Sequence, residues 1–336
     1  KGMQYAADCL FREGVTPEEL VAAFPREKKG MSRWEKQPHK MKDQVPLMRD
    51  EECIEFPVDQ TTITKRYADE GIAFITESVT ADQPFFLYLA NSMPHTPLFA
   101  SPQFKGKSER GLYGDVIEEI DFNVGRILRH LKELGIDRNT LVVVTSDNGP
   151  WLIKGEHGGS ALPLFEGKMT TFEGGQRVPC VMQWPGKIPA GSVCDELTLS
   201  MDLLPTFAQL CGAALPTVQP LDGKDISALL TGDAKSPQEA YYFYYGNQLQ
   251  AVRQGKWKLH FPHGYRTMAG KPGGTGGIPT NYSQAKIGLS LFDLHSDIGE
   301  STDVKEKFPK IAKRLKSLGE KFNQELQKSK RPAGKI

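Results

Sequence analysis

A long amphipathic segment between two apolar runs is the feature that most constrains the fold of this chain. Residues 84–90 (PFFLYLA) and 141–145 (LVVVT) are apolar without alternation, which is typical of strands buried on both faces. Between them, residues 115–134 carry apolar side chains at helical spacing, and Gly135 marks the helix end. A third apolar run covers residues 178–184. This order of strands and helix predicts an α/β domain around a largely parallel sheet.

The segments around this pattern complete the predicted domain. Residues 1–60 are rich in proline and charge and are predicted to be irregular, apart from a helix over residues 17–23. Helical spacing over residues 62–79 and 200–210 predicts two further helices. The α/β domain is therefore expected to cover residues 1–214.

After Ala213 the pattern changes to short strands and turns. Residues 263–288 are rich in Gly, Pro and Thr and are predicted to form a long loop. A hairpin is expected around Gly255. The remaining predicted elements are short strands at 241–245, 250–254, 256–261 and 289–294, a short helix at 226–230 and an amphipathic helix at 308–326. We therefore predict a small α+β subdomain over residues 215–336.

The composition excludes several classes of protein. The 336 residues carry 42 Lys and Arg against 41 Asp and Glu, a net charge of +1 that lacks the basic excess of a nucleic-acid-binding protein. The apolar runs fall far short of the roughly 20 residues that a membrane span needs. The five cysteines include no C-x-x-C pair, so no zinc pattern is present. We expect neither a nucleic-acid partner nor a membrane partner.

The sequence Ser146-Asp147-Asn148-Gly149 directly follows the predicted strand at 141–145. Ligands of open α/β sheets bind at the carboxyl ends of the strands. The side-chain oxygens of Asp147 and Asn148 are ligands of the kind that Ca²⁺ or Mg²⁺ takes. Asn-Gly is equally a turn signal, so a simple turn is the alternative interpretation.

Two glycine-rich segments follow. Residues 155–159 contain His157, and residues 167–175 contain Lys168. Glycine lets a backbone approach a ligand closely, and Lys168 can place an ammonium group on an anion. The order of a phosphate-binding P-loop is absent. A surface loop without a ligand is the alternative.

His95 lies between two prolines just beyond the predicted strand at 84–90. A backbone fixed in this way suits a general acid or base, although a lone histidine is more often structural. His260 and His263 flank a predicted strand end, and we assign them surface or packing roles. The loop at residues 270–277 (GKPGGTGG) follows no strand and is weak evidence of a nucleotide site.

In this order the motifs resemble those of the type I sulfatases, of the arylsulfatase and N-acetylgalactosamine-6-sulfatase kind. The shared pattern is a strand before H-x-P, a strand ending in S-D-N-G, then H-G-G-S, G-K-x-T-T-x-E-G-G-x-R-V-P and a strand ending in W-P-G. It covers residues 85–186, and the similarity continues over 200–210 and 257–303.

The resemblance implies an alkaline-phosphatase-like α/β sandwich around a largely parallel mixed sheet, with a small C-terminal α+β subdomain. It implies hydrolysis of sulfate esters by a formylglycine nucleophile with Ca²⁺, or Mg²⁺ as the alternative ion. Asp147 and Asn148 match metal ligands of the family. Lys168 matches the lysine that holds a sulfate oxygen, His95 the general acid, and His157 a less uniform position that contacts substrate.

One departure from the family pattern is large. Neither C-x-P-S-R nor S-x-P-S-R occurs here, and the early Asp-Asp metal pair and the G-K-W-H-L-G segment of the family are missing. We therefore expect the formylglycine to lie upstream of this chain. The chain alone is expected to be inactive, to bind Ca²⁺ poorly, and to need the missing N-terminal segment or homo-oligomerisation for stable folding.

The resemblance implies a sulfated small molecule or glycan as substrate. It also implies a periplasmic or secreted location, or a lysosomal one in a eukaryote. Two alternatives stay open. One is a phosphodiesterase or phosphonate hydrolase of the alkaline phosphatase superfamily, and the other is a non-catalytic remnant that binds sulfated glycans.

Overall fold

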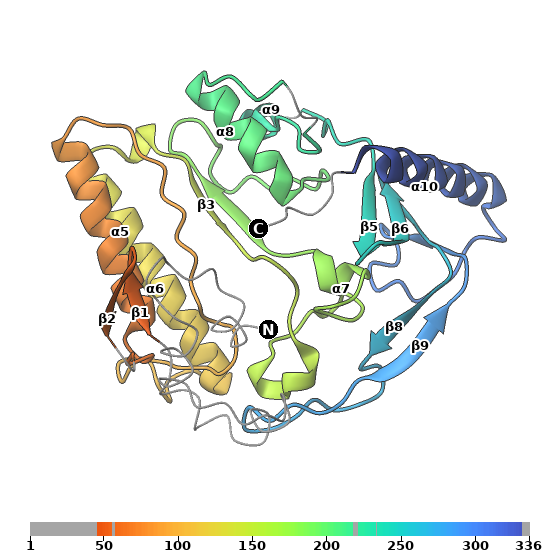
Figure 1. Ribbon diagram of the computed structural model, residues 1–336, viewed down its shortest axis with the longest axis horizontal. Helices are drawn as coiled ribbons and strands as arrows, with labels where there is room; N and C mark the ends of the chain where they lie inside the picture. The colour runs from red at the N-terminus through yellow and green to blue at the C-terminus, as the bar shows by residue number, and fades with distance from the viewer. Residues whose placement is uncertain (1–45, 56–57, 218–220, 233, 331–336) are drawn as a thin grey trace. The chain divides into compact units, whose positions relative to one another are not determined.

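The computed structural model describes residues 46–55, 58–217, 221–232 and 234–330 (Figure 1). The chain divides into two compact units. Of the described residues, the first contains those up to Ile127, together with Lys154–Gly158 and Gly273–Thr280, and the second contains the others. The helix predicted at residues 17–23 lies outside the described residues.

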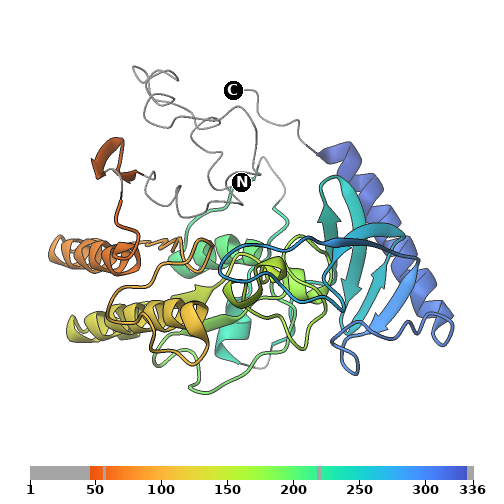
Figure 2. The ribbon, with the colours of Figure 1, turned by 90° about the horizontal axis from the view of Figure 1, so that it is seen from below.

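Two helices dominate the first unit. They are α5 (Ile63–Thr80) and α6 (Gly111–Glu133), close to the predicted helices at 62–79 and 115–134. They lie side by side in both views (Figures 1 and 2). Arg126 of α6 donates to Asp69 of α5 over 2.6 Å, which links the two helices. A short antiparallel pair, β1 (Leu47–Arg49) and β2 (Glu52–Glu55), corrects the prediction that residues 1–60 are irregular.

The predicted buried strand at residues 84–90 is wrong. The segment is extended, but no described strand pairs with it, and the side chains of Phe86 and Tyr88 are 70% and 82% exposed. The alternate residues Leu87 and Leu89 lie against Gly71 of α5. The apolar run therefore covers a helix with one face only, and the other face is left exposed.

The second unit begins with β3 (Val142–Thr145), which pairs with β4 (Cys180–Gln183). The two elements match the predicted strands at 141–145 and 178–184. Their pairing is antiparallel, because residues 146–179 turn the chain back beside β3. Every strand pair in the described part of the chain is antiparallel, so the parallel strand pairs that were predicted are not found among the described residues. The expectation that both strands are fully buried is wrong, since Val144 and Val181 are exposed.

A four-stranded antiparallel sheet forms the C-terminal part of the second unit. Its strands stand in the order β10-β7-β6-β5. Their bounds are β5 (Tyr241–Tyr245), β6 (Gln248–Gln254), β7 (Trp257–His260) and β10 (Ser290–Asp293). Gly255, with φ of 56°, forms the predicted turn between β6 and β7, because that backbone conformation suits glycine.

The terminal helix α10 (Pro309–Ser329) covers one face of this sheet, against β6 and β7 (Figure 2). Leu315 of the helix is completely buried against Val252, Leu259 and Leu291 of the strands. The predicted amphipathic helix is thereby confirmed, with its apolar stripe in the core. The predicted α+β character of this region is also confirmed.

The predicted loop at 263–288 contains a hairpin instead. β8 (His263–Thr267) and β9 (Ser283–Ile287) pair antiparallel over five residues each (Figure 1). Burial along β8 alternates, with His263 and Thr267 buried and Gly264 and Arg266 exposed. The alternation is carried by polar residues, so hydrophobicity did not reveal it.

Shorter helices complete the second unit. The predicted helix at 200–210 is the short helix η3 (Ser200–Asp202) followed by α8 (Leu203–Cys211), and that at 226–230 is α9 (Ser227–Thr231). A single 3₁₀ turn, η1 (Asp137–Asn139), precedes β3. Within the described residues, no helix is both long and apolar enough to cross a membrane.

Candidate functional site

The predicted metal ligands lie where β3 ends. Asp147 is exposed and Asn148 is half-buried, and the Ser146 hydroxyl donates to the carbonyl oxygen of Asn148 over 3.2 Å. The buried Gly149 donates its N–H to the carbonyl of Gly175 over 3.1 Å. A Cβ at Gly149 would lie 1.8 Å from the carbonyl oxygen of Gly174. The turn therefore requires glycine at position 149 because its backbone is in contact with the loop of residues 165–175.

Lys168 is carried by that loop of residues 165–175, which we call the Lys168 loop. The Lys168 N–H donates to the carbonyl of Pro150 over 2.8 Å, and its Nζ lies 5.6 Å from the centre of the Trp151 ring. Together with the contact between Gly149 and Gly175, this bond fixes the Lys168 loop to the turn that bears Asp147 and Asn148. The structure thus brings the predicted cation and the predicted metal ligands to one strand end.

A buried ionic cluster lies at the end of the Lys168 loop, where α7 (Glu173–Gln176) begins. Glu173 contacts Lys258 Nζ over 2.9 Å and Arg253 Nη1 over 3.1 Å. Lys258 Nζ also lies 3.0 Å from Glu300 Oε1, and His260 Nε2 lies 2.8 Å from the same oxygen. The side chains of Lys258, His260, Glu300 and Glu173 are at most 2% exposed. Such a group is stable only when its charges are paired, as they are here.

The surroundings set the charge states in this cluster. Burial lowers the pKa of His260 to about 4, although the hydrogen bond to Glu300 opposes the shift. Burial acts to raise the pKa of Glu300, but Lys258 and the bond from His260 outweigh it and hold that pKa below its usual value. His260 is therefore neutral and Glu300 ionised at neutral pH. Of the surface or packing roles predicted for His260 and His263, the packing role is confirmed, since both side chains are buried and lie against Phe172.

A second buried carboxylate, Glu166, precedes Lys168 in the sequence, whereas Glu173 follows it. Glu166 is 5% exposed and accepts hydrogen bonds from the Thr267 hydroxyl and from the Met268 N–H, the latter over 3.2 Å. Sequence reasoning missed Glu166, Glu173 and Glu300 as a set, because their partners are 40 to 127 positions away in the chain. The one available signal was the presence of Glu173 in the G-K-x-T-T-x-E-G-G motif.

His157 belongs to the first unit, at the end of the 3₁₀ segment η2 (Leu152–His157). A Cβ at Gly277 would lie 3.1 Å from His157 Nδ1. The neighbouring Glu156 accepts the N–H of Gly276 over 2.5 Å, and this bond is the main cause that lowers the pKa of Glu156. The glycine-rich segment Gly273–Thr280 therefore lies against His157.

His95 also belongs to the first unit, in the turn after residues 84–90. It is exposed, and its Nδ1 lies 2.8 Å from the carbonyl oxygen of Thr96. A carbonyl oxygen only accepts, so Nδ1 carries a hydrogen and Nε2 is the nitrogen that exchanges a proton in neutral histidine. Asp147, Asn148 and Lys168 lie in the second unit, so the structure groups three of the five predicted residues.

The donor set at the end of β3 fits a hard cation in part. A carboxylate and an amide oxygen are the ligands that Ca²⁺ and Mg²⁺ prefer, and they project from one turn. Among the described residues, no group of three or more His, Cys, Asp or Glu side chains could hold a metal. Asp147 and Asn148 thus supply two of the roughly six to eight oxygens that calcium takes.

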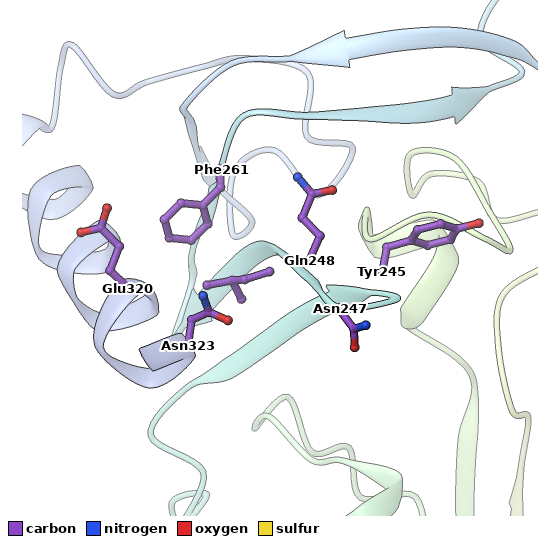
Figure 3. Close-up of a pocket in the computed structure, with 7 residues that line it drawn as sticks. Tyr245, Asn247, Gln248, Phe261, Glu320 and Asn323 are labelled. Carbon is purple, nitrogen blue, oxygen red and sulfur yellow. The ribbon is translucent and has the colours of Figure 1, made fainter. Parts of the chain in front are cut away.

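A pocket of about 590 Å³ opens on the C-terminal sheet, and the five predicted site residues do not line it (Figure 3). Glu320 and Asn323 reach it from α10, and Phe261 comes from the segment that follows β7. The complete lining is Tyr245, Asn247, Gln248, Leu249, Phe261, Glu320 and Asn323. The lining holds a carboxylate and no Lys, Arg or His, so an anionic ester would be repelled there.

Comparison with known proteins identifies the chain's relatives. A family model described as Sulfatase matches residues 18–213, and one described as the C-terminal region of aryl-sulfatase matches residues 236–335. The chain is 43% identical to N-acetylgalactosamine-6-sulfatase of Canis lupus familiaris over 227 residues, which are 65% of this chain and 43% of the relative. It is 36% identical to arylsulfatase A of Homo sapiens over 287 residues, covering 82% of this chain and 55% of the relative.

Solved structures with a similar fold include sulfatases. The PsFucS1 sulfatase from Pseudoalteromonas sp. superposes with a TM-score of 0.77 at 25% identity, over 94% of this chain and 63% of that one. Ps i-CgsB, solved in complex with a neocarrahexaose, has a TM-score of 0.66 at 28% identity, over 87% of this chain and 62% of that one. The α/β fold class with a C-terminal α+β part, expected from the resemblance, is thereby confirmed.

These relatives are longer than the chain, which spans about half the length of the curated proteins it matches. The Sulfatase model nevertheless covers more than half of the 336 residues, and it includes the five predicted site residues His95, Asp147, Asn148, His157 and Lys168. The chain belongs to the sulfatase family.

Proposed function

We propose that this chain is the sulfate-binding and metal-binding part of a sulfuric ester hydrolase. The observation that carries the proposal is the junction at the end of β3. There, backbone hydrogen bonds from Gly149 and Lys168 hold the loop that carries the lysine against the turn that carries a carboxylate and an amide. A sulfate monoester is an anion whose charge is spread over its oxygens, and its transfer depends on positioning and charge stabilisation. A fixed cation beside hard oxygen ligands supplies both.

Each residue has a role in this proposal. Lys168 binds a sulfate oxygen, and Asp147 with Asn148 contributes ligands for Ca²⁺, or for Mg²⁺ as the alternative ion. The bound metal would polarise the sulfate oxygens. His95 donates a proton to the leaving alcohol from Nε2, and His157 contacts the substrate.

The proposed nucleophile is a formylglycine outside these 336 residues, in a segment upstream, because neither C-x-P-S-R nor S-x-P-S-R occurs in them. This chain alone is proposed to be inactive and to associate with that segment or with another copy of itself. The boundary near residue 214 also stays a proposal, and the gap between the two matched families at residues 213 and 236 supports it.

The proposed substrate is a sulfated carbohydrate. Support comes from a relative named N-acetylgalactosamine-6-sulfatase and from a structural neighbour solved with a neocarrahexaose. We further propose an exported location, in the periplasm, outside the cell or in the lysosome, because the family is usually exported.

The test uses the full-length protein and the 336-residue chain in parallel. Hydrolysis of 4-nitrophenyl sulfate is compared with that of 4-nitrophenyl phosphate and of a phosphonate monoester, before and after treatment with EDTA. We expect sulfate hydrolysis by the full-length protein, its loss with EDTA and its recovery with Ca²⁺. Faster phosphonate than sulfate hydrolysis would favour a phosphonate hydrolase, and binding of sulfated glycan without turnover would favour a non-catalytic protein.

A further inference from the structure

We propose that Glu166 and Glu173 are positioning residues that fix Lys168 from both sides. Each is a buried carboxylate within five positions of Lys168, and each is bound to the C-terminal part of the second unit. The C-terminal strands would then set the geometry of the sulfate-binding lysine without touching the substrate. This inference deepens the proposed function and rests on it.

The anchor at Glu173 is ionic. Its two carboxylate oxygens contact Lys258 and Arg253, which are neighbours on the paired strands β6 and β7. Its backbone N–H donates to Glu300 Oε2 over 2.6 Å, so main chain and side chain are held at once. Within the cluster the carboxylates of Glu173 and Glu300 are paired with Lys258 and Arg253, and the more exposed Arg177 lies 4.0 Å from Glu173 at its edge. Removing the charge of Glu173 would leave the fully buried Lys258 with one partner fewer in a dry environment.

The anchor at Glu166 is formed by hydrogen bonds, and no charged side chain of the described residues forms an ion pair with it. Thr267, the last residue of β8, and the N–H of Met268 donate to the two carboxylate oxygens. The backbone of Glu166 has φ of 57°, and that of Met169 has φ of 75°. A residue other than glycine rarely adopts this region, so surrounding contacts must hold it there. The bonds to Thr267 and Met268 are such contacts.

Between the anchors, the Lys168 loop is bonded to itself. The Thr170 hydroxyl donates to Gly167 O over 2.8 Å, Gly174 N donates to Phe165 O over 2.9 Å, and Gln176 Nε2 donates to Thr170 O over 3.1 Å. A loop closed in this way moves as one piece. A shift at either anchor therefore displaces the Lys168 ammonium, and a misplacement of about 1 Å costs on the order of 100-fold in rate.

The test is a double-mutant cycle in the full-length protein. We compare Glu173→Gln, Glu166→Gln and Lys168→Met with the two doubles that combine each glutamate change with Lys168→Met. For each, kcat and KM are measured on 4-nitrophenyl sulfate. A residue that acts through Lys168 loses its effect once that lysine is gone. We expect each glutamate change to lower kcat by about 10-fold to 100-fold alone, and by less than 2-fold in the Lys168→Met background.

The matched control is Asp202→Asn. Asp202 is completely buried and accepts hydrogen bonds from the N–H groups of Leu199 and Lys224 and from the Gln238 side chain. Among the described residues, none of these donors belongs to the Lys168 loop. We expect this change to lower the thermal midpoint and to leave kcat unchanged. The positioning role would be overturned if the glutamate changes lowered kcat by the same factor in the wild-type and Lys168→Met backgrounds. It would also be overturned if Asp202→Asn lowered kcat as much as the glutamate changes do. Glu166→Gln removes no charge from an ion pair, so it keeps the test valid if Glu173→Gln does not fold.

A second readout separates this inference from the proposed function. Hydrogen exchange of residues 165–175 is measured in the wild type and in both single glutamate variants. Faster exchange confined to this loop supports the anchors, and unchanged exchange overturns them, whether or not the protein cleaves sulfate esters. A wild-type protein that lacks turnover would refute the hydrolase proposal alone.

Discussion

The Nε2 atom of His260 lies 2.8 Å from Oε1 of Glu300, and neither side chain is exposed to solvent. Phe172 stacks on the imidazole with ring centres 4.6 Å apart. The histidine is therefore enclosed by a ring and a carboxylate, and its protonation would add a second buried positive charge near that of Lys258.

We predict that stability falls as the pH decreases from about 6.5 to about 4. Burial lowers the pKa of His260 to about 4 in the folded chain, against 6.5 for the free side chain. In this interval the unfolded chain binds a proton that the folded chain does not, so the free energy of unfolding falls, by on the order of 3 kcal/mol. The lowered pKa of Glu300 acts in the same direction as the pH falls through its range.

Urea unfolding between pH 4 and pH 8 measures this dependence. His260→Gln cannot titrate and should show a flatter profile between pH 4 and 6.5. The exposed His295 provides the control, since His295→Gln should keep the wild-type slope. Equal slopes in His260→Gln and the wild type would exclude His260 as the source.

We predict that Lys168→Met lowers kcat/KM for a sulfate ester by at least about 100-fold in the full-length protein, because the cation beside the sulfate oxygens is lost. Stability should change little, since the Lys168 side chain is half-buried and the backbone bond to Pro150 remains. Steady-state kinetics and thermal unfolding measure the two effects. Lys187→Met, at an exposed position, is the control and should behave as wild type. An active Lys168→Met enzyme would remove the lysine from the proposed mechanism.

We predict that Gly149→Ala both destabilises the protein and weakens Ca²⁺ binding. The new Cβ would lie 1.8 Å from Gly174 O, so the backbone that carries Asp147 and Asn148 must move. The expected loss is about 1–3 kcal/mol, as for other overpacked positions. Gly288→Ala is the control, because a Cβ there meets nothing within 4 Å. Thermal unfolding and calcium titration test both effects, and unaltered calcium affinity in Gly149→Ala would argue against a metal at this turn.

We predict that Leu315→Ala destabilises the C-terminal part of the second unit by about 2–5 kcal/mol, because the side chain is fully buried and its removal leaves a cavity. Leu204 on α8 is 58% exposed, so Leu204→Ala should cost far less. Chemical denaturation of both variants measures the difference. Similar losses for the two would mean that α10 contributes little to the core.

The parts of the fold that depend on local pattern were predictable. Helices α5, α6 and α10 are long and periodic, and the turn at Gly255 carries a hairpin signal. The burial of residues 84–90 was not predictable, because it depends on what packs against each face. The hairpin of β8 and β9 was missed because its alternation is polar.

Part of the candidate site was predictable from the sequence, as part of the fold was. The oxygen ligands and Lys168 follow from short motifs and from their place after a strand. The carboxylates that hold the Lys168 loop were not predictable, since Glu173 meets Lys258 and Glu300 only through tertiary contacts. A buried ion pair between distant residues has no local signal in a single sequence.

The two backbone bonds between the turn after β3 and the Lys168 loop have a consequence for protein engineering. Gly149 bonds to Gly175, and Lys168 bonds to Pro150, so an insertion or deletion in one segment shifts the register of both bonds. Residues 146–175 must therefore be transplanted between homologues as one block. New substrate selectivity is better sought by varying loop length outside that block.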